Sequence, residues 1–267
     1  SVIVNIISVL ILNKITYIKY PFIISASFFL LFYFMFMDNK YQSGLDVLSD
    51  RQFKDLKDKN IGLVINHTSV DSYGEHLIDL AIKNNLKVEA IFTPEHGFEG
   101  IVEAGQNIPN DKNNKLDIPI YSLYGKNRKP TSEMLNSIDI LIFDIQDIGV
   151  RYYTYISTMA LIMEAASEVG VPLLILDRLN PLGDEADGPL LNIEYSSFVG
   201  MYPVPIRHGI SIGELAKMIK GEGWIDTENQ LDLNIVEYKG TPTKQDAKKA
   251  FNINPSPNMQ NLKTAWI

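Results

Sequence analysis

The sequence contains no cysteine among its 267 residues. This absence excludes disulfide scaffolds, thiolate zinc sites, cysteine nucleophiles and a lipidated N-terminal cysteine. Positive charge is also scarce, because 24 Lys and Arg stand against 32 Asp and Glu and the net charge is -8. An acidic chain binds a phosphate backbone poorly, so nucleic acid is not an expected partner. Hydrophobic residues at 46% and charged residues at 21% are typical of a globular protein.

Sequence motifs of several enzyme classes are missing as well. No G-x-G-x-x-G follows the first predicted strand, Gly125-Lys126 lacks the upstream glycine of a Walker loop, and neither G-x-S-x-G nor H-E-x-x-H occurs. No cofactor is therefore expected. The histidines lack the spacing of metal ligands, so no metal is expected, although a metal-dependent hydrolase stays an alternative.

An apolar run lies near the N-terminus. Residues 20–37 carry no charge, while Lys14 and Lys19 precede them and Asp38 follows. A basic flank before an apolar segment is typical of an export signal or a membrane anchor. The run is close to the ~20 residues that span a bilayer as a helix, and the alternative is a buried core helix. We expect residues 1–43 to be an export signal or membrane anchor with a linker, and the rest of the protein to be periplasmic or secreted.

The rest of the sequence alternates between apolar strands and amphipathic helices. Strands are predicted at residues 61–65, 88–92, 118–123, 138–145 and 172–176, with a later one at 231–238. Strands that are apolar throughout indicate a parallel sheet covered by helices on both faces. We therefore expect an α/β protein with a Rossmann-like, open and mostly parallel sheet, because a TIM barrel needs eight βα units.

Capping residues predict where several helices begin and end. Ser49 with Gln52 resembles a capping box that opens a helix through Lys59, and Ser211 with Glu214 resembles a second one. A helix over residues 153–169 is closed by Gly170. Residues 103–117 are rich in Asn and Gly and predict a loop. We expect a catalytic domain over residues 44–222 and the start of a smaller, truncated C-terminal domain over residues 223–267.

Polar side chains follow four of the predicted strands, where open α/β sheets bind their ligands. These candidates are Asn66 and His67; Glu95 and His96; Asp144, Gln146, Asp147 and Arg151; and Asp177, Arg178 and Asn180. Each residue taken alone could cap the following helix. That explanation suits Thr68 or Ser69 but accounts poorly for four polar strand ends that include two histidines and two arginines.

The segment that points most specifically to catalysis is Thr93–Phe98 (TPEHGF). Pro94 ends the strand and Gly97 permits a tight turn, so Glu95 is held at the sheet edge between aromatic neighbours. A carboxyl group beside apolar surface favours its protonated form, which a general acid requires. The alternative is a Glu that caps the turn. His96 is a rival for the acid role or a residue that orients Glu95.

Five segments follow one another along the chain: Thr93–Phe98, Phe143–Tyr155, Asp177–Gly183, Arg207–Gly209 and Pro255–Met259. Together they resemble the bacterial exo-β-N-acetylmuramidase family. The resemblance runs from about Gly44 to the last residue, and Leu179 replaces an expected proline. It implies an exported enzyme with a Rossmann-like domain, a smaller C-terminal domain and an active site in the cleft between them. It also implies release of N-acetylmuramic acid from the non-reducing ends of peptidoglycan fragments, with Glu95 as the catalytic residue. Members of the family continue for well over a hundred further residues, so the resemblance implies a C-terminal truncation that leaves the chain with little activity.

Glycoside hydrolysis usually needs a second carboxyl group, which Asp144 or Asp147 could supply, unless the substrate's acetamido group acts as nucleophile. The catalytic candidates are Glu95, His96 and Asp144. An arginine fork could bind the lactyl carboxylate of muramic acid, and each arginine could equally form a structural ion pair. Tyrosines 152, 153 and 155 could stack on a sugar, although at least one should belong to the core. The substrate-binding candidates are Asn66, His67, Gln146, Asp147, Arg151, Tyr153, Asp177, Arg178, Arg207 and His208.

Two further functions stay open. A sugar-binding protein without catalysis would fit a truncated chain, and a metal-dependent hydrolase would be sensitive to chelators. The expected partners are peptidoglycan-derived muramic acid glycosides, together with a membrane through the N-terminal run.

Overall fold

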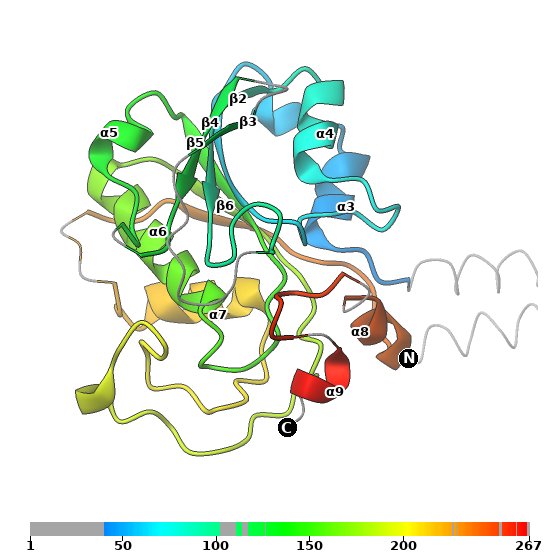
Figure 1. The fold of residues 1–267 in the computed structure, drawn as a ribbon, viewed down its shortest axis with the longest axis vertical. Coiled ribbons are helices and arrows are strands. Elements are labelled where there is room, and N and C mark those ends of the chain that lie inside the picture. Colours follow the sequence, from blue (N-terminus) through cyan, green and yellow to red (C-terminus); the bar gives the residue numbers. More distant parts are fainter. Residues whose placement is uncertain are drawn as a thin grey trace, which may run out of the picture. The chain divides into compact units, whose positions relative to one another are not determined.

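Seven strands of the computed structural model form one sheet in the order β3-β4-β2-β1-β5-β6-β7 (Figure 1). The strands are β1 (Asn60–Ile65), β2 (Lys87–Thr93), β3 (Asp111–Asn113), β4 (Ile118–Ser122), β5 (Ile140–Asp144), β6 (Leu173–Leu176) and β7 (Leu233–Val236). Neighbouring strands are parallel except for β3, which runs antiparallel to β4 at the edge. From β4 to β7 this is the doubly wound order of Rossmann folds, so the predicted fold class is confirmed.

The structure describes residues 40–101, 111–113, 117–125, 127–225, 227, 229–250, 253–259 and 261–265. The chain divides into two units, residues 1–40 and 41–267, and every element named here belongs to the second. The apolar run at residues 20–37 lies outside the described residues. No helix in the described ranges is long and apolar enough to cross a membrane.

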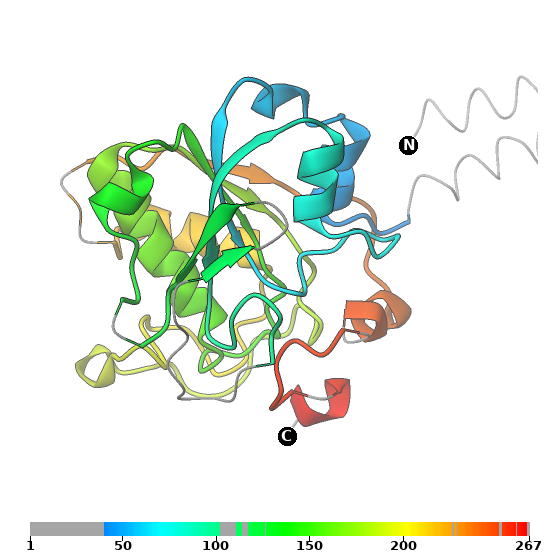
Figure 2. The ribbon, with the colours of Figure 1, turned by 45° about the horizontal axis from the view of Figure 1, so that its top comes forward.

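Helices cover both faces of the sheet. One face carries α5 (Ser132–Leu135), α6 (Tyr155–Val169) and α7 (Ile212–Gly221), and the other carries α3 (Gly44–Asp50), the short η1 (Lys54–Leu56) and α4 (Leu77–Lys83). Further along the chain lie η2 (Ile193–Tyr195), α8 (Lys244–Ala250) and α9 (Leu262–Ala265). The two covering layers lie on opposite sides of the strands in both views (Figures 1 and 2).

Alternating side chains of the strands build two separate cores. In β5, Leu141 and Phe143 pack under α6, whereas Ile140 and Ile142 pack toward α3 and α4. The same period-two division separates Val64 of β1 from its neighbours in the strand. Because both faces are buried, the strands are apolar throughout, which is the pattern that the sequence presents.

Most predicted elements are confirmed within a few residues, but two are wrong. The capping box of the first helix lies at Ser43 and Asp46, so α3 ends where the sequence predicted a helix to begin. Gln52 and Phe53 then take positive φ angles of 56° and 51°, which break the helix. The segment predicted as loop contains β3, whose backbone pairs with β4. The predicted domain boundary after residue 222 falls between α7 and β7, and β7 pairs with β6 in the same sheet.

Candidate active site

The predicted site residues collect around the point where the strand order reverses. β1 and β5 are neighbours, but β1 connects onward to one side of the sheet and β5 to the other. The loops that follow these strands therefore diverge at the carboxyl edge, which is where doubly wound sheets bind their ligands. Asn66 follows β1 there and Asp144 ends β5, and both side chains are fully buried.

A polar turn ties the ends of these two strands together. The Asn66 side-chain oxygen accepts hydrogen bonds from the Thr68 amide at 2.9 Å and from its hydroxyl at 2.6 Å. The Thr68 hydroxyl in turn accepts from the Gln146 amide at 3.0 Å, and the Ser69 hydroxyl donates to the Asp144 carbonyl. These contacts position Asn66 and Gln146 through the backbone of both strand ends.

Glu95 lies in a tight turn after β2. The Gly97 amide donates to the Pro94 carbonyl at 3.1 Å, and His96 and Gly97 both take positive φ angles, 72° and 74°. The Glu95 side chain is only partly buried, and one carboxylate oxygen accepts from the Thr154 hydroxyl at 3.0 Å. The site therefore contains a carboxyl group that is held by a hydroxyl group, on a residue that is only partly buried. His96 itself is buried.

Asp144 is engaged by an arginine from the next strand end. Arg178 donates from Nε to one carboxylate oxygen at 2.6 Å and from Nη2 to the other at 2.8 Å, and Nη2 also reaches the Val70 carbonyl at 3.0 Å. Both side chains are buried. Burial opposes the charge of the guanidinium, but the adjacent Asp144 carboxylate outweighs this effect and raises the pKa of Arg178.

Asp147 and His208 form a second buried pair. One Asp147 oxygen accepts from the Gly149 amide at 2.7 Å and from His208 Nε2 at 3.0 Å. The other Asp147 oxygen and His208 Nδ1 are buried and make no hydrogen bond within the described part of the chain. Gly149 has a φ of 85°, and a Cβ atom there would lie 2.2 Å from the Asn180 side chain. This turn thus requires glycine.

Asp177 has a capping role at α7. Its carboxylate accepts from the Gly213 amide at 2.8 Å and from the Ser211 hydroxyl at 2.9 Å, both at the start of that helix. Burial raises the pKa of Asp177 despite these bonds. Asn180 also bonds locally, since its oxygen accepts from the Leu182 amide at 2.9 Å.

The remaining two predicted arginines contact backbone carbonyls. Arg151 donates from Nη1 to Pro189 at 2.8 Å and to Val204 at 2.5 Å, which fixes the base of the long loop between β6 and α7. Arg207 donates to the Leu182 carbonyl at 2.7 Å. All three predicted arginines therefore have structural contacts, and Arg178 is the most completely engaged of them.

His67 and the tyrosines meet a segment from the far end of the chain. His67 Nε2 donates to the Asn254 carbonyl at 2.6 Å, and the Tyr155 hydroxyl donates to the Pro255 carbonyl at 2.9 Å. Tyr155 is buried in the core, as expected for at least one of the tyrosines. Tyr153 packs edge-on against it with ring centroids 4.5 Å apart, while Tyr152 is half exposed.

Comparison with known proteins identifies the family. The family model described as "Exo-beta-N-acetylmuramidase NamZ, N-terminal" matches residues 61–263, which is most of the sequence. The chain belongs to this family. The resemblance predicted from the five sequence segments is thereby confirmed.

Relatives of this NamZ N-terminal family are similar in both sequence and structure. The chain is 45% identical over 233 residues to the peptidoglycan beta-N-acetylmuramidase NamZ of Bacillus subtilis (strain 168), which covers 85% of this chain and 55% of that protein. Crystal structures of two DUF1343 family proteins from Bacteroides fragilis match with TM-scores of 0.76 and 0.72 at 39% and 38% identity. Each covers 85% of this chain, which spans 58% and 59% of theirs. The chain thus spans little more than half the length of these relatives.

The structure of this NamZ-family chain also brings in residues that were not predicted as site residues. Thr154 holds Glu95, and the carbonyl groups of Asn254 and Pro255 contact His67 and Tyr155. Thr154 and Pro255 lie inside two of the segments that carry the family resemblance, which was the available signal. The contacts of Thr154 and Pro255 join positions about 60 and 100 residues apart in sequence, so no local pattern indicates them.

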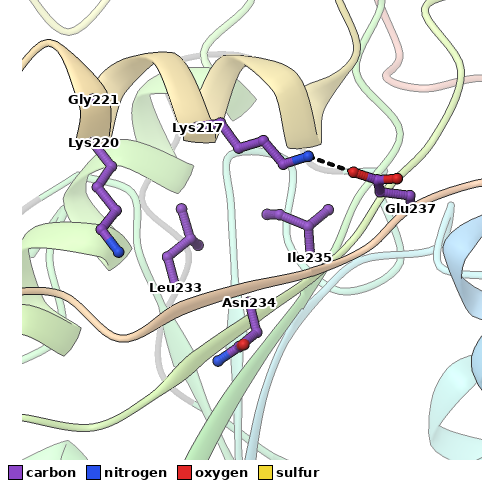
Figure 3. Close-up of a pocket in the computed structure, with 7 residues that line it drawn as sticks. All are labelled: Lys217, Lys220, Gly221, Leu233, Asn234, Ile235 and Glu237. Carbon is purple, nitrogen blue, oxygen red and sulfur yellow. Dashed lines mark hydrogen bonds and ion pairs between the residues drawn. The ribbon is translucent and has the colours of Figure 1, made fainter.

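A pocket of about 410 Å³ lies elsewhere, between α7 and the edge strand β7 (Figure 3). It is lined by Lys217, Lys220, Gly221, Leu233, Asn234, Ile235 and Glu237. None of the predicted site residues is among them. Within the described part of the chain, no group of three or more His, Asp and Glu side chains is arranged to hold a metal ion.

Proposed function

We propose that this chain carries the catalytic site of an exo-acting glycoside hydrolase that releases N-acetylmuramic acid from the non-reducing ends of peptidoglycan fragments. The observation that carries the proposal is the partly buried Glu95, held by the Thr154 hydroxyl at the carboxyl edge, in a chain 45% identical to a peptidoglycan beta-N-acetylmuramidase. The whole activity is a proposal because the chain spans 55% of that relative.

In this mechanism Glu95 is the general acid. It protonates the glycosidic oxygen as the bond to the anomeric carbon breaks, and the charge left on its carboxylate is stabilised by the Thr154 hydroxyl. The rigid turn around Glu95 supports this role, because a positioned acid must hold its geometry through the transition state. His96 is the rival for the acid role, and its burial favours an orienting function instead.

Asp144 and Asp147 differ as candidates for the second group. Both oxygens of Asp144 are bound by Arg178, so its charge is already neutralised. Asp147 keeps one oxygen without a hydrogen bond in the described part of the chain. We therefore favour Asp147 as the residue that assists the anomeric carbon or orients the substrate's acetamido group.

Recognition of the lactyl carboxylate falls to Arg151 or Arg207 in this proposal. Arg178 is occupied by Asp144, whereas the hydrogen bonds of Arg151 to Pro189 and Val204 both use Nη1 and the residue is partly exposed. Asn66, His67, Gln146, Tyr153 and His208 stay candidates for contacts with the sugar, and Asp177 stays one despite its capping role.

The test is release of a chromophore from a β-linked N-acetylmuramic acid glycoside. It should be run on this chain and on a fusion to the remaining C-terminal part of the Bacillus subtilis relative. Release by either protein supports the hydrolase if Glu95→Gln strongly slows it. Binding of muramic acid without release by both proteins would instead favour the sugar-binding alternative. Chelator-sensitive release would favour a metal-dependent hydrolase.

We further propose that residues 1–43 export the protein and attach it to a membrane, with the sheet domain outside the cytoplasm. The uncharged run at residues 20–37 after two lysines supports this proposal. Cell fractionation with an antibody against the sheet domain tests it. Recovery in the cytosolic fraction with an intact N-terminus would refute export.

A further inference from the structure

The chain returns to the carboxyl edge of the sheet after β7. Residues 254–259 contact the loops that follow three different strands. The Asn254 carbonyl accepts from His67 after β1, and the Pro255 carbonyl accepts from Tyr155 at the start of α6. Met259 packs against the small cluster of Ile148, Val150 and Leu182, which follow β5 and β6. This return segment lies across the edge on which the predicted site residues collect (Figures 1 and 2).

A β-turn shapes the return segment. The Met259 amide donates to the Ser256 carbonyl at 2.9 Å, so Pro257 and Asn258 occupy the two central positions. Proline suits the first central position because its φ angle is already set. Ser256 is buried beneath the turn, while the Asn258 side chain is exposed at its tip. The segment is therefore an ordered structure with a polar tip.

Two of its anchors are directly connected to the Glu95 turn. Thr154, which bonds Glu95, immediately precedes Tyr155, which bonds Pro255. On the other side, the His67 ring lies against Gly100, where an added Cβ atom would come within 2.0 Å of the imidazole. Gly100 is the last residue of the run of turns that begins at Glu95. The anchors and the carboxyl group thus share two short stretches of backbone.

We propose that residues 254–259 form one wall of the Glu95 site, and that Tyr155 and His67 are the positioning residues that hold this wall in place. The anchoring is independent of the ligand, whereas the view that the wall contacts N-acetylmuramic acid rests on the proposed function. The Tyr155 hydroxyl is buried, so its loss leaves the Pro255 carbonyl without a donor until the segment moves out to water.

Hydrogen exchange of the Met259 amide is the direct readout, because that amide closes the turn. Tyr155→Phe keeps the ring and removes only the hydroxyl. We expect the Met259 amide to exchange about five- to tenfold faster, the usual net effect of one hydrogen bond, with a melting temperature only about 2–4 °C lower. Tyr202→Phe is the matched control, since its buried hydroxyl has no hydrogen bond in the described residues. Unchanged exchange in Tyr155→Phe, or an equal increase in Tyr202→Phe, would overturn the proposal.

Two substitutions of His67 test the second anchor independently, one that removes the donor and one that restores it. His67→Leu removes the donor to Asn254 and should accelerate exchange at Met259 as Tyr155→Phe does. His67→Gln places an amide nitrogen at a reach similar to that of Nε2 and should restore protection. Equal exchange in the Leu and Gln variants would show that ring packing, and not the hydrogen bond, holds the segment.

Titration with N-acetylmuramic acid separates this inference from the proposed function. We expect Tyr155→Phe to raise the Kd about three- to tenfold, and Tyr202→Phe to leave it unchanged. Equal affinity of the wild type and Tyr155→Phe would show that the segment is not a wall of the sugar site. No binding by the wild type would contradict the proposed function, while the exchange measurement would still decide whether Tyr155 anchors the segment.

Discussion

Arg178 binds both carboxylate oxygens of Asp144, at 2.6 and 2.8 Å, with both side chains buried where β5 and β6 end. The pair lies next to the switch point of the sheet and also reaches the loop after β1 through the Val70 carbonyl. It therefore connects the loops that follow β1, β5 and β6. Two buried charges stabilise the fold only as long as they are paired with each other.

Removing one partner of this pair should lower the stability of the protein. Asp144→Asn leaves a buried guanidinium without a counter-charge, and we expect the free energy of unfolding to fall by about 3–5 kcal/mol. Urea unfolding followed by circular dichroism measures the change. Glu237→Gln, which breaks the exposed pair with Lys217, is the control and should have little effect. If the two variants are equally stable, the Asp144–Arg178 pair is not a structural requirement.

Substitution of Glu95 should remove activity without unfolding the protein. In the protein that releases the chromophore, Glu95→Gln keeps the size of the side chain but cannot supply a proton, so kcat should fall by roughly 10²–10⁴. Substrates with very good leaving groups should lose less, because they need little protonation. Thr154→Val should lower kcat by a smaller factor, since it removes only the hydrogen bond to the carboxylate. Near-complete loss in His96→Ala with activity kept in Glu95→Gln would assign the acid role to His96.

An arginine that binds the lactyl group should give selectivity. A muramic acid glycoside should exceed the N-acetylglucosamine analogue in kcat/KM by ~10² or more, because the analogue leaves an arginine unpaired. Arg151→Gln or Arg207→Gln should reduce this ratio, while Arg178→Lys should lower stability and leave the ratio intact. Similar kcat/KM values for the two sugars in the wild type would contradict recognition of the lactyl carboxylate by an arginine.

The stability of the protein should depend on pH through His67. Burial lowers the pKa of His67, and the nearby His76 and His96 act in the same direction. The folded state thus holds this ring neutral, while the unfolded chain takes up a proton near pH ~6.5. Stability from this group is present above pH ~6.5 and is lost as the pH falls toward the lowered folded value.

Urea unfolding at pH 7.5 and 5.5 tests the His67 contribution. His67→Gln should show a smaller loss of unfolding free energy between the two conditions than the wild type, because the glutamine does not titrate. The other three histidines remain in both proteins, so the difference reports His67 together with its interaction with His76 and His96. An identical loss in both proteins would mean that the ring is not held neutral by the fold.

The strands were predictable because their signal is local. β5 reads as a continuous apolar run that ends in Asp144, and burial of both faces leaves no other pattern. The capping box of α7 at Ser211 and Glu214 was equally plain. The first capping box was misassigned because Ser49 and Gln52 have the same residue types as a true box, and only tertiary packing selects Ser43 and Asp46.

The partners of the site residues could not be predicted in the same way. Sequence identified Asp144 and Arg178 as polar residues at strand ends, but their pairing depends on the spacing of β5 and β6 in the folded sheet. The contact between His67 and Asn254 joins residues 187 positions apart. The positions of polar residues after the strands predict which groups lie at the edge of the sheet. The orientation of these groups comes from the packed backbone.

The left-handed backbone at His96 has a cost in stability that depends on which residue occupies the position. A residue with a Cβ atom pays about 1–2 kcal/mol to hold a φ of 72°, which glycine would adopt without penalty. His96→Gly would relieve this cost but would also remove a buried imidazole and empty the space that the ring fills, which opposes the gain. His96→Ala loses the same ring and keeps the Cβ atom, so it should be less stable than His96→Gly. The difference in unfolding free energy between these two variants therefore measures what the left-handed backbone costs at this position.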